Sequence, residues 1–272
     1  MDKLQTQGIS FARLGFGTFR MQGDVCRTAV ESALELGYTH IDTAAMYGNE
    51  EAVGAALASS SIARSDLHIT TKVWHDQLTP DAIRASLDTS LNKLQLDYVD
   101  LFMVHWPAAE MNLPAIFETL AKLKAEGRTR AIGVCNFTLP LLRTVVDDIG
   151  APIACNQIEY HVLLDQTPIR SYLASKGIPI VAYCPLAQGT LAENPALIAI
   201  GAKHGASPAQ VALKWLLDQD GVAAIPKAQR ASSQKANLEA LKLELDDDDR
   251  RTIAALPKDQ RFVKPPFAPA WD

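Results

Sequence analysis

The amino-acid sequence predicts an α/β protein folded as a (β/α)₈ (TIM) barrel, with residues 1–272 forming one domain. Strand and helix patterns alternate at intervals of about 30 residues, as in consecutive βα units. Several predicted strands are continuous apolar runs, which is typical of parallel strands buried on both faces. The length of 272 residues also lies within the usual size of one such barrel.

The first half of the chain contains four of these units. Pro80 suits the first turn of the third helix, Asn49 suits the N-cap of the second, and Gly37 and Gly127 stand where glycine commonly ends a helix. The predicted strands are 13–18, 39–42, 67–73 and 99–104, and the predicted helices are 25–36, 50–58, one starting at 79–81, and 114–125.

The second half repeats the alternation, and Ser207 is the expected N-cap of one of its helices. The predicted strands are 131–136, 153–159, 178–183 and 222–226, and the helices are one from 140, then 168–176, 195–204, one after 207, and 232–241. Four acids at 246–249 precede a last helix ending near Leu256, and they indicate a solvated helix N-terminus stabilised by the dipole more than a cation site.

Residues 257–272 form a proline-rich tail that contains Phe262, Phe267 and Trp271. Its four prolines argue against regular structure. We expect this tail to fold over the mouth of the barrel.

A doubly wound sheet is the alternative α/β fold. It would carry a G-x-G-x-x-G turn after its first strand. Residues 15–17 (Gly-Phe-Gly) lack the third glycine and a helix that starts directly after it, which argues against this fold.

Composition excludes several classes of function. The net charge of −5 and the isoelectric point near 5.7 argue against binding to nucleic acid or to a membrane surface. No apolar run approaches the ~20 residues of a membrane span, and residues 1–8 lack the apolar segment of a signal peptide, so we expect a cytoplasmic protein. No C-x-x-C pair occurs, and buried reduced thiols are expected at Cys26, Cys135, Cys155 and Cys184.

Three successive strands end in ionisable residues, namely Asp42, Lys72 and His105, and Tyr47 follows five residues after Asp42. The carboxyl ends of barrel strands meet at the mouth, where barrel enzymes have their active sites. A lysine ammonium beside a tyrosine stabilises the phenolate and lowers the pKa of the tyrosine, and an aspartate keeps the lysine charged. The four residues therefore predict an acid/base device for a carbonyl or an alcohol, in an aromatic pocket walled by Trp74 and Trp106.

Other chemistries remain to be weighed for the same residues. Lys72 alone would also suit a Schiff-base aldolase, although Asp42 and Tyr47 argue against it. The segment from His40 to Asp42 resembles part of a metal site, but no second histidine pair or carboxylate cluster completes one, so no metal is expected.

Ten motifs, which together span most of the chain, resemble the aldo-keto reductase family. Within that family they are similar to the bacterial group that includes 2,5-diketo-D-gluconate reductases and methylglyoxal reductases. The motifs are 14–18 (LGFGT), 37–44 (GYTHIDTA), 47–50 (YGNE), 71–74 (TKVW), 97–101 (DYVDL), 105–107 (HWP), 132–137 (IGVCNF), 156–157 (NQ), 183–186 (YCPL) and 225–227 (IPK).

The resemblance implies a monomeric, NADPH-dependent enzyme that reduces small aldehydes and ketones such as methylglyoxal, keto-sugars or aromatic aldehydes. It makes Tyr47 the general acid, Asp42 and Lys72 its tuning groups, and His105 the residue that orients the substrate. It places substrate contacts at Phe19, Tyr47, Trp74, His105 and Trp106, and assigns specificity to the tail. It places cofactor contacts at Gly17, Thr18, Asp42, Cys135, Asn136, Gln157, Tyr183, Pro185, Leu186, Gln188, Lys227, Arg230 and Asn237.

The sequence departs from the family pattern at two places. Cys135 stands where serine is usual, and a thiol is the weaker hydrogen-bond donor. Ser233 stands where an arginine is common, although Lys227 and Arg230 remain to bind a 2′-phosphate. NADPH is therefore expected, with weaker discrimination against NADH.

A cofactor-binding regulatory subunit, similar to the potassium-channel β subunits, is the alternative to an enzyme. Such subunits are expected to bring an N-terminal extension or a partner-binding surface. The sequence begins only a few residues before its first predicted strand, which favours the enzyme.

Overall fold

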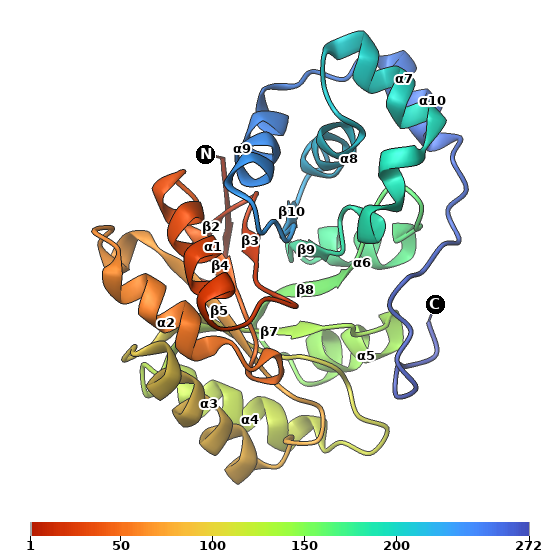
Figure 1. The fold of residues 1–272 in the computed structure, drawn as a ribbon. Coiled ribbons are helices and arrows are strands. Elements are labelled where there is room, and N and C mark those ends of the chain that lie inside the picture. The colour runs from red at the N-terminus through yellow and green to blue at the C-terminus, as the bar shows by residue number, and fades with distance from the viewer. Residues whose placement is uncertain (1, 272) are drawn as a thin grey trace.

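The computed structural model describes residues 2–271 and contains an eight-stranded parallel sheet surrounded by helices (Figure 1). Neighbouring strands follow one another in sequence, which is the order that consecutive βα units produce. The strands are β3 (Phe16–Gly17), β4 (His40–Asp42), β5 (His68–Val73), β6 (Val99–Val104), β7 (Thr129–Cys135), β8 (Ile153–Glu159), β9 (Ile180–Tyr183) and β10 (Val222–Ala224).

The sheet closes on itself between its first and last strands. Leu14, just before β3, forms a parallel bridge with Ala224 of β10. The Gly15 N–H donates to the Ala224 carbonyl at 2.9 Å, and the Ala224 N–H donates to the Arg13 carbonyl at 2.7 Å. At Gly17 a Cβ atom would lie 2.8 Å from the Ile225 carbonyl oxygen, so this close approach requires glycine. The predicted (β/α)₈ barrel is therefore confirmed.

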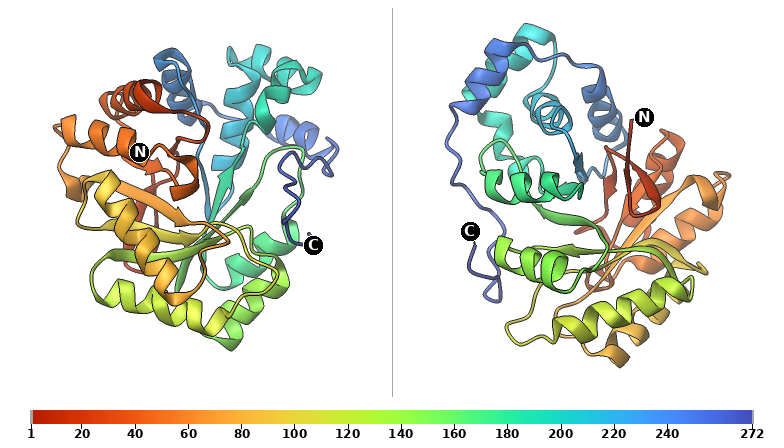
Figure 2. Two further views of the ribbon diagram at one scale, coloured as in Figure 1. Left: turned by 60° about the horizontal axis from the view of Figure 1, so that its bottom comes forward. Right: turned by 180° about the vertical axis from the view of Figure 1, so that it is seen from behind.

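The helices lie outside the strands (Figures 1 and 2), and most of them bury an apolar face in a core shared with the sheet. The long α-helices begin within two residues of where the sequence predicts them. They are α1 (Gly23–Glu35), α2 (Glu50–Ser59), α3 (Pro80–Leu94), α4 (Leu113–Ala125), α5 (Leu139–Arg143), α6 (Thr167–Ser175), α7 (Pro195–His204), α8 (Pro208–Leu217), α9 (Ala231–Glu239) and α10 (Asp247–Ala254). Shorter 3₁₀ turns are η1 (Ala45–Tyr47), η2 (Arg64–Asp66), η4 (Ala187–Glu193) and η5 (Ala240–Lys242), and α5 continues as one π-helical turn, η3 (Thr144–Asp148).

An N-terminal hairpin, which the sequence analysis does not predict, precedes the barrel. It consists of β1 (Lys3–Thr6) and β2 (Ile9–Ala12), paired antiparallel. Phe11 packs on His40 and His68, the first residues of β4 and β5, with ring centroids 5.3 and 5.0 Å apart. The hairpin therefore covers the amino-terminal end of the barrel and leaves the carboxyl end as the open mouth.

One local prediction is confirmed in position only, and another needs correction. Asn49 is the N-cap residue of α2, but its side chain does not cap the helix. It binds Thr43 Oγ1 and the carbonyls of Thr18 and Met21, because these buried groups need partners. Asp249 of α10 is not solvated, since it is 3% exposed and bonded to Lys203 and His204 of α7.

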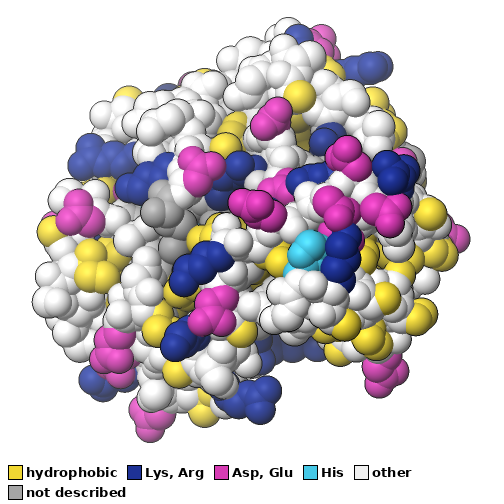
Figure 3. Space-filling view, turned by 90° about the horizontal axis from the view of Figure 1, so that it is seen from above, with side chains coloured by type: hydrophobic (Ala, Val, Ile, Leu, Met, Phe, Trp, Pro, Cys, Tyr) yellow, Lys and Arg dark blue, Asp and Glu magenta, His cyan; other side chains and the backbone are white. Residues whose placement is uncertain are grey.

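The surface above α7 and α10 carries acidic and basic side chains interspersed, with no large patch of one sign (Figure 3). Within residues 2–271, none of the helices is long and apolar enough to cross a membrane. All four cysteines are free thiols, and three of them are buried.

The C-terminal tail follows α10 as irregular chain. It runs from α10 past α6 toward the C-terminus (dark blue in Figures 1 and 2). Its aromatic residues reach the barrel mouth, where Phe267 lies against Trp74 and Trp106 with centroids 5.5 and 5.6 Å apart. The expectation that the tail folds over the mouth is confirmed.

Candidate active site

A buried ion pair lies at the carboxyl ends of β4 and β5. Lys72 Nζ donates to Asp42 Oδ1 at 2.6 Å and to the Thr43 carbonyl at 2.8 Å, and both charged side chains are almost completely buried. Burial by itself would lower the pKa of Lys72, but the Asp42 carboxylate outweighs this effect and raises it above the ordinary value. Lys72 is therefore a permanent cation inside the barrel wall.

Tyr47 lies above this pair, on the η1 turn between β4 and α2. The Lys72 ammonium is 5.2 Å from the centroid of the Tyr47 ring. Burial raises the pKa of Tyr47 to about 12, and the opposing effect of Lys72 is smaller. The expectation that Lys72 brings this pKa below its ordinary value is therefore wrong for the protein alone, because desolvation of the phenolate dominates. Tyr47 holds its proton at neutral pH.

His105 follows β6 and packs between aromatic rings. Its ring centroid is 5.5 Å from that of Tyr47 and 5.0 Å from that of Trp74. Burial, together with the Lys72 charge, holds the pKa of His105 well below its ordinary value, so the imidazole is neutral. Within residues 2–271 its buried Nδ1 has no hydrogen-bond partner. His105 therefore retains hydrogen-bonding capacity for a bound molecule.

Three polar side chains, one directly after β7 and one each from β8 and β9, continue the site around the mouth. Gln157 Nε2 donates to Asp42 Oδ2 at 2.8 Å. Asn136 has a left-handed backbone with φ of 61°, and its Nδ2 donates to the His105 carbonyl at 3.0 Å. The Tyr183 hydroxyl donates to Asn136 Oδ1 at 2.7 Å, which holds this half-buried ring at the rim. Gln157 is therefore bonded to Asp42, and Asn136 links Tyr183 to the His105 carbonyl; the two sets are joined by the Asn136 N–H, which donates to the Gln157 carbonyl at 2.9 Å.

Aromatic side chains wall the mouth. Phe19 is 43% exposed and lies 4.9 Å from the Tyr47 ring, measured between centroids. Trp74 and Trp106 stand on the opposite side, where the tail residue Phe267 covers them. All five predicted substrate-pocket residues (Phe19, Tyr47, Trp74, His105 and Trp106) therefore lie in one contiguous aromatic group at the mouth.

The remaining predicted residues lie in two places: within the barrel, or on the segments that follow β9 and β10. Gly17 and Thr18 are buried beside Asp42, and Thr18 Oγ1 donates to the Asp42 carbonyl at 3.0 Å. Cys135 is buried with its sulfur 3.9 Å from that of Met103, inside the barrel and not in the polar network. The others lie on the loops after β9 and β10: Pro185, Leu186 and Gln188 on the first, and Lys227 and Arg230 on the second, with Asn237 on the following helix α9.

The loop after β9 has an unusual backbone. Cys184, Ala187 and Gln188 all have φ values between 46° and 55°, a conformation that costs non-glycine residues roughly 1–3 kcal/mol each. Such strain is typical of loops that shape a binding site. Lys227 and Arg230 are both exposed at the amino end of α9, where the helix dipole also favours an anion.

Sequence reasoning missed several residues that contact the site. Thr43 supplies a carbonyl acceptor for Lys72, and His75 stacks on Phe267 with centroids 4.1 Å apart. Glu159, at the end of β8, binds the tail. The available signal for Glu159 was its position, because it is the last residue of the predicted strand 153–159 and comes two residues after the NQ motif at 156–157.

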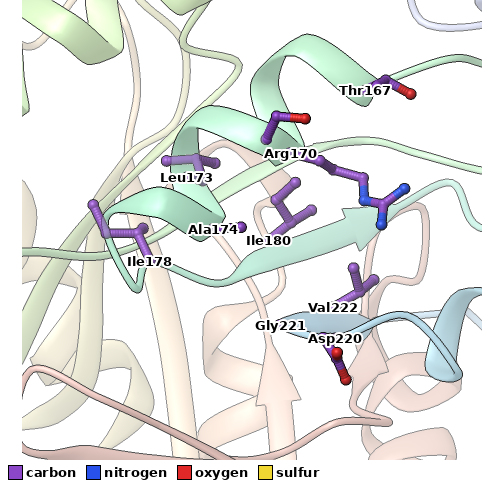
Figure 4. A pocket seen from close by; sticks show the side chains of 10 residues that line it. Thr167, Arg170, Leu173, Ala174, Ile178, Ile180, Asp220, Gly221 and Val222 are labelled. Carbon is purple, nitrogen blue, oxygen red and sulfur yellow. The ribbon is translucent and has the colours of Figure 1, made fainter.

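Other features of the described residues do not form part of this site. A cavity of about 250 Å³ lies between α6 and the amino ends of β9 and β10, lined by Arg170, Ile180 and Asp220 among others (Figure 4). Because it lies at the amino ends of its strands, it is separate from the mouth. Residues 2–271 contain no cluster of three or more His, Cys, Asp or Glu side chains that could hold a metal ion.

Comparison with known proteins agrees with this geometry. The model of the aldo/keto reductase family matches residues 13–258. Methylglyoxal reductase DkgB of Escherichia coli O157:H7 is 43% identical over 262 residues, which cover 95% of this chain and 98% of that protein. Glyoxal reductase of Bacillus subtilis strain 168 is 39% identical over 255 residues, covering 93% of this chain and 92% of that one.

A solved structure provisionally assigned as a 2,5-diketo-D-gluconic acid reductase B superimposes with a TM-score of 0.97 and 38% identity, covering 100% of this chain and 98% of that chain. The similarity therefore extends over strands, helices and tail alike. Because the family model matches most of the sequence and these relatives align over nearly all of it, the chain is an oxidoreductase that belongs to the aldo/keto reductase family.

Proposed function

We propose that this enzyme is an NADPH-dependent reductase of small aldehydes and ketones, with Tyr47 as its general acid. The observation that carries the proposal is the arrangement of Asp42, Lys72, Tyr47 and His105 around one point of the barrel mouth. The groups are matched to carbonyl reduction, which needs a proton donor and a hydrogen-bond donor at the same oxygen.

Each of these side chains has a distinct part in the proposed reaction. His105, kept neutral by burial, donates a hydrogen bond that orients the carbonyl oxygen toward Tyr47. Tyr47 gives its proton to that oxygen as negative charge develops there. The Lys72 charge stabilises the phenolate that remains, and the Asp42 carboxylate, bonded to Lys72 and Gln157, keeps the ammonium in place.

The described residues fit a nicotinamide cofactor. When bound, NADPH supplies the hydride that reduces the carbonyl carbon. The Tyr183 ring, fixed by its bond to Asn136, offers a flat face at the rim. Asn136 and Gln157 each use one amide N–H in the bonds described, which leaves a second for a carboxamide group.

The exposed cations Lys227 and Arg230, at the amino end of α9, are suited to a 2′-phosphate. We infer from them a preference for NADPH over NADH. Pro185, Leu186 and Gln188, on the left-handed loop after β9, and Asn237 on α9 would line the path between the nicotinamide and the adenine end. Gly17, Thr18 and Cys135 would support the site from within the barrel wall.

The substrate is inferred to be a small carbonyl compound. The relatives named methylglyoxal reductase and glyoxal reductase motivate methylglyoxal and glyoxal as first candidates. The aromatic wall of Trp74, Trp106 and Phe267 additionally suits an aromatic aldehyde. Keto-sugars follow from the likeness to the 2,5-diketo-D-gluconic acid reductase B structure.

The test is the oxidation of NADPH, followed by its near-ultraviolet absorbance, with methylglyoxal, an aromatic aldehyde, a diketo-gluconate and an aldose, and then repeated with NADH. We expect Tyr47→Phe to reduce kcat by a factor of about 10² to 10⁴, the usual contribution of a positioned proton donor. Binding of NADPH, measured by its fluorescence, should stay within about twofold of the wild type.

An undiminished rate in Tyr47→Phe would contradict the role given to this tyrosine. Tight NADPH binding without turnover of any carbonyl would instead favour a regulatory, cofactor-binding role. A monomeric state and a cytoplasmic location stay predictions from the sequence, to be checked by light scattering and by cell fractionation.

A further inference from the structure

Glu159, the last residue of β8, is a fully buried carboxylate outside the group of residues that surround the carbonyl. A buried carboxylate is costly unless it is paired or hydrogen-bonded. Two main-chain N–H groups of the C-terminal tail satisfy it: Phe262 donates to Oε1 at 2.7 Å and Val263 donates to Oε2 at 3.0 Å. His161 Nε2 lies 3.0 Å from Oε1 and completes the shell.

These contacts favour the ionised carboxylate. Burial would raise the pKa of Glu159, but the bonds from His161 and from the two tail N–H groups outweigh it and hold the pKa below its ordinary value. Hydrogen bonds to a charged acceptor are stronger than neutral ones. The tail is therefore held to the barrel by an ionised group on a rigid strand.

A second set of contacts holds the part of the tail that precedes Phe262. Asp259 forms a bridge with Leu164, and the Gln260 N–H donates to the Leu163 carbonyl at 3.0 Å. These contacts align the tail beside the segment after β8. The bonds to Glu159 then fix Phe262 and Val263, a few residues before Phe267.

Phe267 is the tail residue placed over the substrate pocket. It stacks on His75 and meets Trp74 and Trp106 edge-on, and it remains 38% exposed. Trp271 lies 5.9 Å from Trp106, between ring centroids, at the end of the same segment. The position of this aromatic wall relative to Tyr47 and His105 therefore depends on how the tail is anchored.

We propose that Glu159 is a specificity-determining positioning residue, which anchors the tail so that Phe267 forms one wall of a slot for the body of an aromatic aldehyde. The inference rests on the proposed carbonyl reductase function. Glu159 acts through the tail and not on the reacting atoms. A three-carbon carbonyl, held by Tyr47 and His105, has no aromatic ring to pack against Phe267.

The first test measures anchoring without any catalysis. Glu159→Gln keeps the size of the side chain but turns one acceptor oxygen into an N–H donor that faces a tail N–H, so one tail bond is lost. Trypsin cleaves after Arg261, next to the Phe262 N–H that Glu159 binds. We expect cleavage there, followed by mass spectrometry, to become at least about tenfold faster, because the site must detach before it is cut.

Glu118→Gln is the matched control, since Glu118 is an exposed glutamate on α4 paired with Lys122. It makes the same chemical change far from the tail and should leave cleavage at the wild-type rate. Val263→Pro is a second variant, which removes one donor from the tail side without altering the barrel. It should accelerate cleavage as Glu159→Gln does, even if the latter folds poorly.

The second test measures selectivity with NADPH and two carbonyls, 4-nitrobenzaldehyde and methylglyoxal. Glu159→Gln should raise KM for the aromatic aldehyde about tenfold, the loss of one or two aromatic contacts, and change kcat and KM for methylglyoxal by less than about twofold. Phe267→Ala should likewise raise KM for the aromatic aldehyde and leave kcat and KM for methylglyoxal nearly unchanged. The double variant should be no worse than Phe267→Ala alone, because Glu159 acts through Phe267.

Three results would overturn the inference: unchanged cleavage after Arg261 in both Glu159→Gln and Val263→Pro, additive effects of Glu159→Gln and Phe267→Ala, or an equal loss of activity on both carbonyls. A wild-type enzyme that reduces neither carbonyl would refute the proposed function instead. In that case the cleavage rates still decide whether Glu159 anchors the tail.

Discussion

Replacing Lys72 by methionine tests the buried ion pair directly. The change keeps a side chain of similar length and removes the charge, so Asp42 is left ionised in a site where it is 1% exposed. Its Oδ2 keeps the bond from Gln157, but Oδ1 loses its only recorded partner among residues 2–271. The Thr43 carbonyl loses a donor at the same time.

The expected loss of stability is about 3–5 kcal/mol, the usual cost of removing one partner of a buried pair. For a protein of this size such a loss lowers Tm by roughly 10 °C.

The assay is urea denaturation followed by tryptophan fluorescence at about pH 7, which gives both the midpoint and the slope needed for a free energy. The double variant Asp42→Asn with Lys72→Met is the control, since it removes both charges. It should recover about 2 kcal/mol of the loss. A Lys72→Met protein as stable as wild type, or a double variant less stable than the single one, would refute the reasoning.

Further predictions concern pH, cofactor choice and the loop that carries Tyr47. Because burial raises the pKa of Tyr47 to about 12 and holds that of His105 well below its ordinary value, kcat/KM for reduction should be flat from about pH 6 to about pH 8; a titration near neutrality would contradict this. Arg230→Leu should weaken NADPH binding at least about tenfold and leave NADH binding unchanged, measured by fluorescence titration; equal losses would exclude a phosphate contact. Asn49→Ala removes three buried hydrogen bonds and should cost about 2–4 kcal/mol in urea denaturation, whereas a loss under about 1 kcal/mol would show that these bonds matter little.

The parts of the fold that sequence predicts well are those with local causes. Pro80 and Ser207 mark helix starts through chemistry confined to one turn, and α3 and α8 begin at or next to them. The strand β6 is recognisable as an apolar run, and β5, β6 and β8 all have nearly the predicted bounds.

The parts that sequence does not reveal depend on tertiary contacts. The β1–β2 hairpin has only four residues in each strand, too short for a clear alternation, and its register depends on packing against the barrel. The direction of the shift in the pKa of Tyr47 was predicted wrongly, because the sequence indicates that Tyr47 lies near Lys72 but does not show that it is buried. Glu159 was overlooked since its partners, Phe262 and Val263, lie over a hundred residues away.

The seam between β3 and β10 has a consequence for the dynamics of the barrel. It is formed by short strands joined at one bridge and a few backbone bonds, whereas β5, β6 and β7 pair over four or five residues. Opening the wall there separates fewer paired strand residues than opening it between β5, β6 and β7, so the amides of Gly15 and Ala224 should exchange with deuterium faster than those of β6. The exposed cations Lys227 and Arg230 begin three residues beyond this seam. A phosphate group bound by them would tether the chain next to this sparsely paired seam, and slower amide exchange at the seam would then report the bound anion.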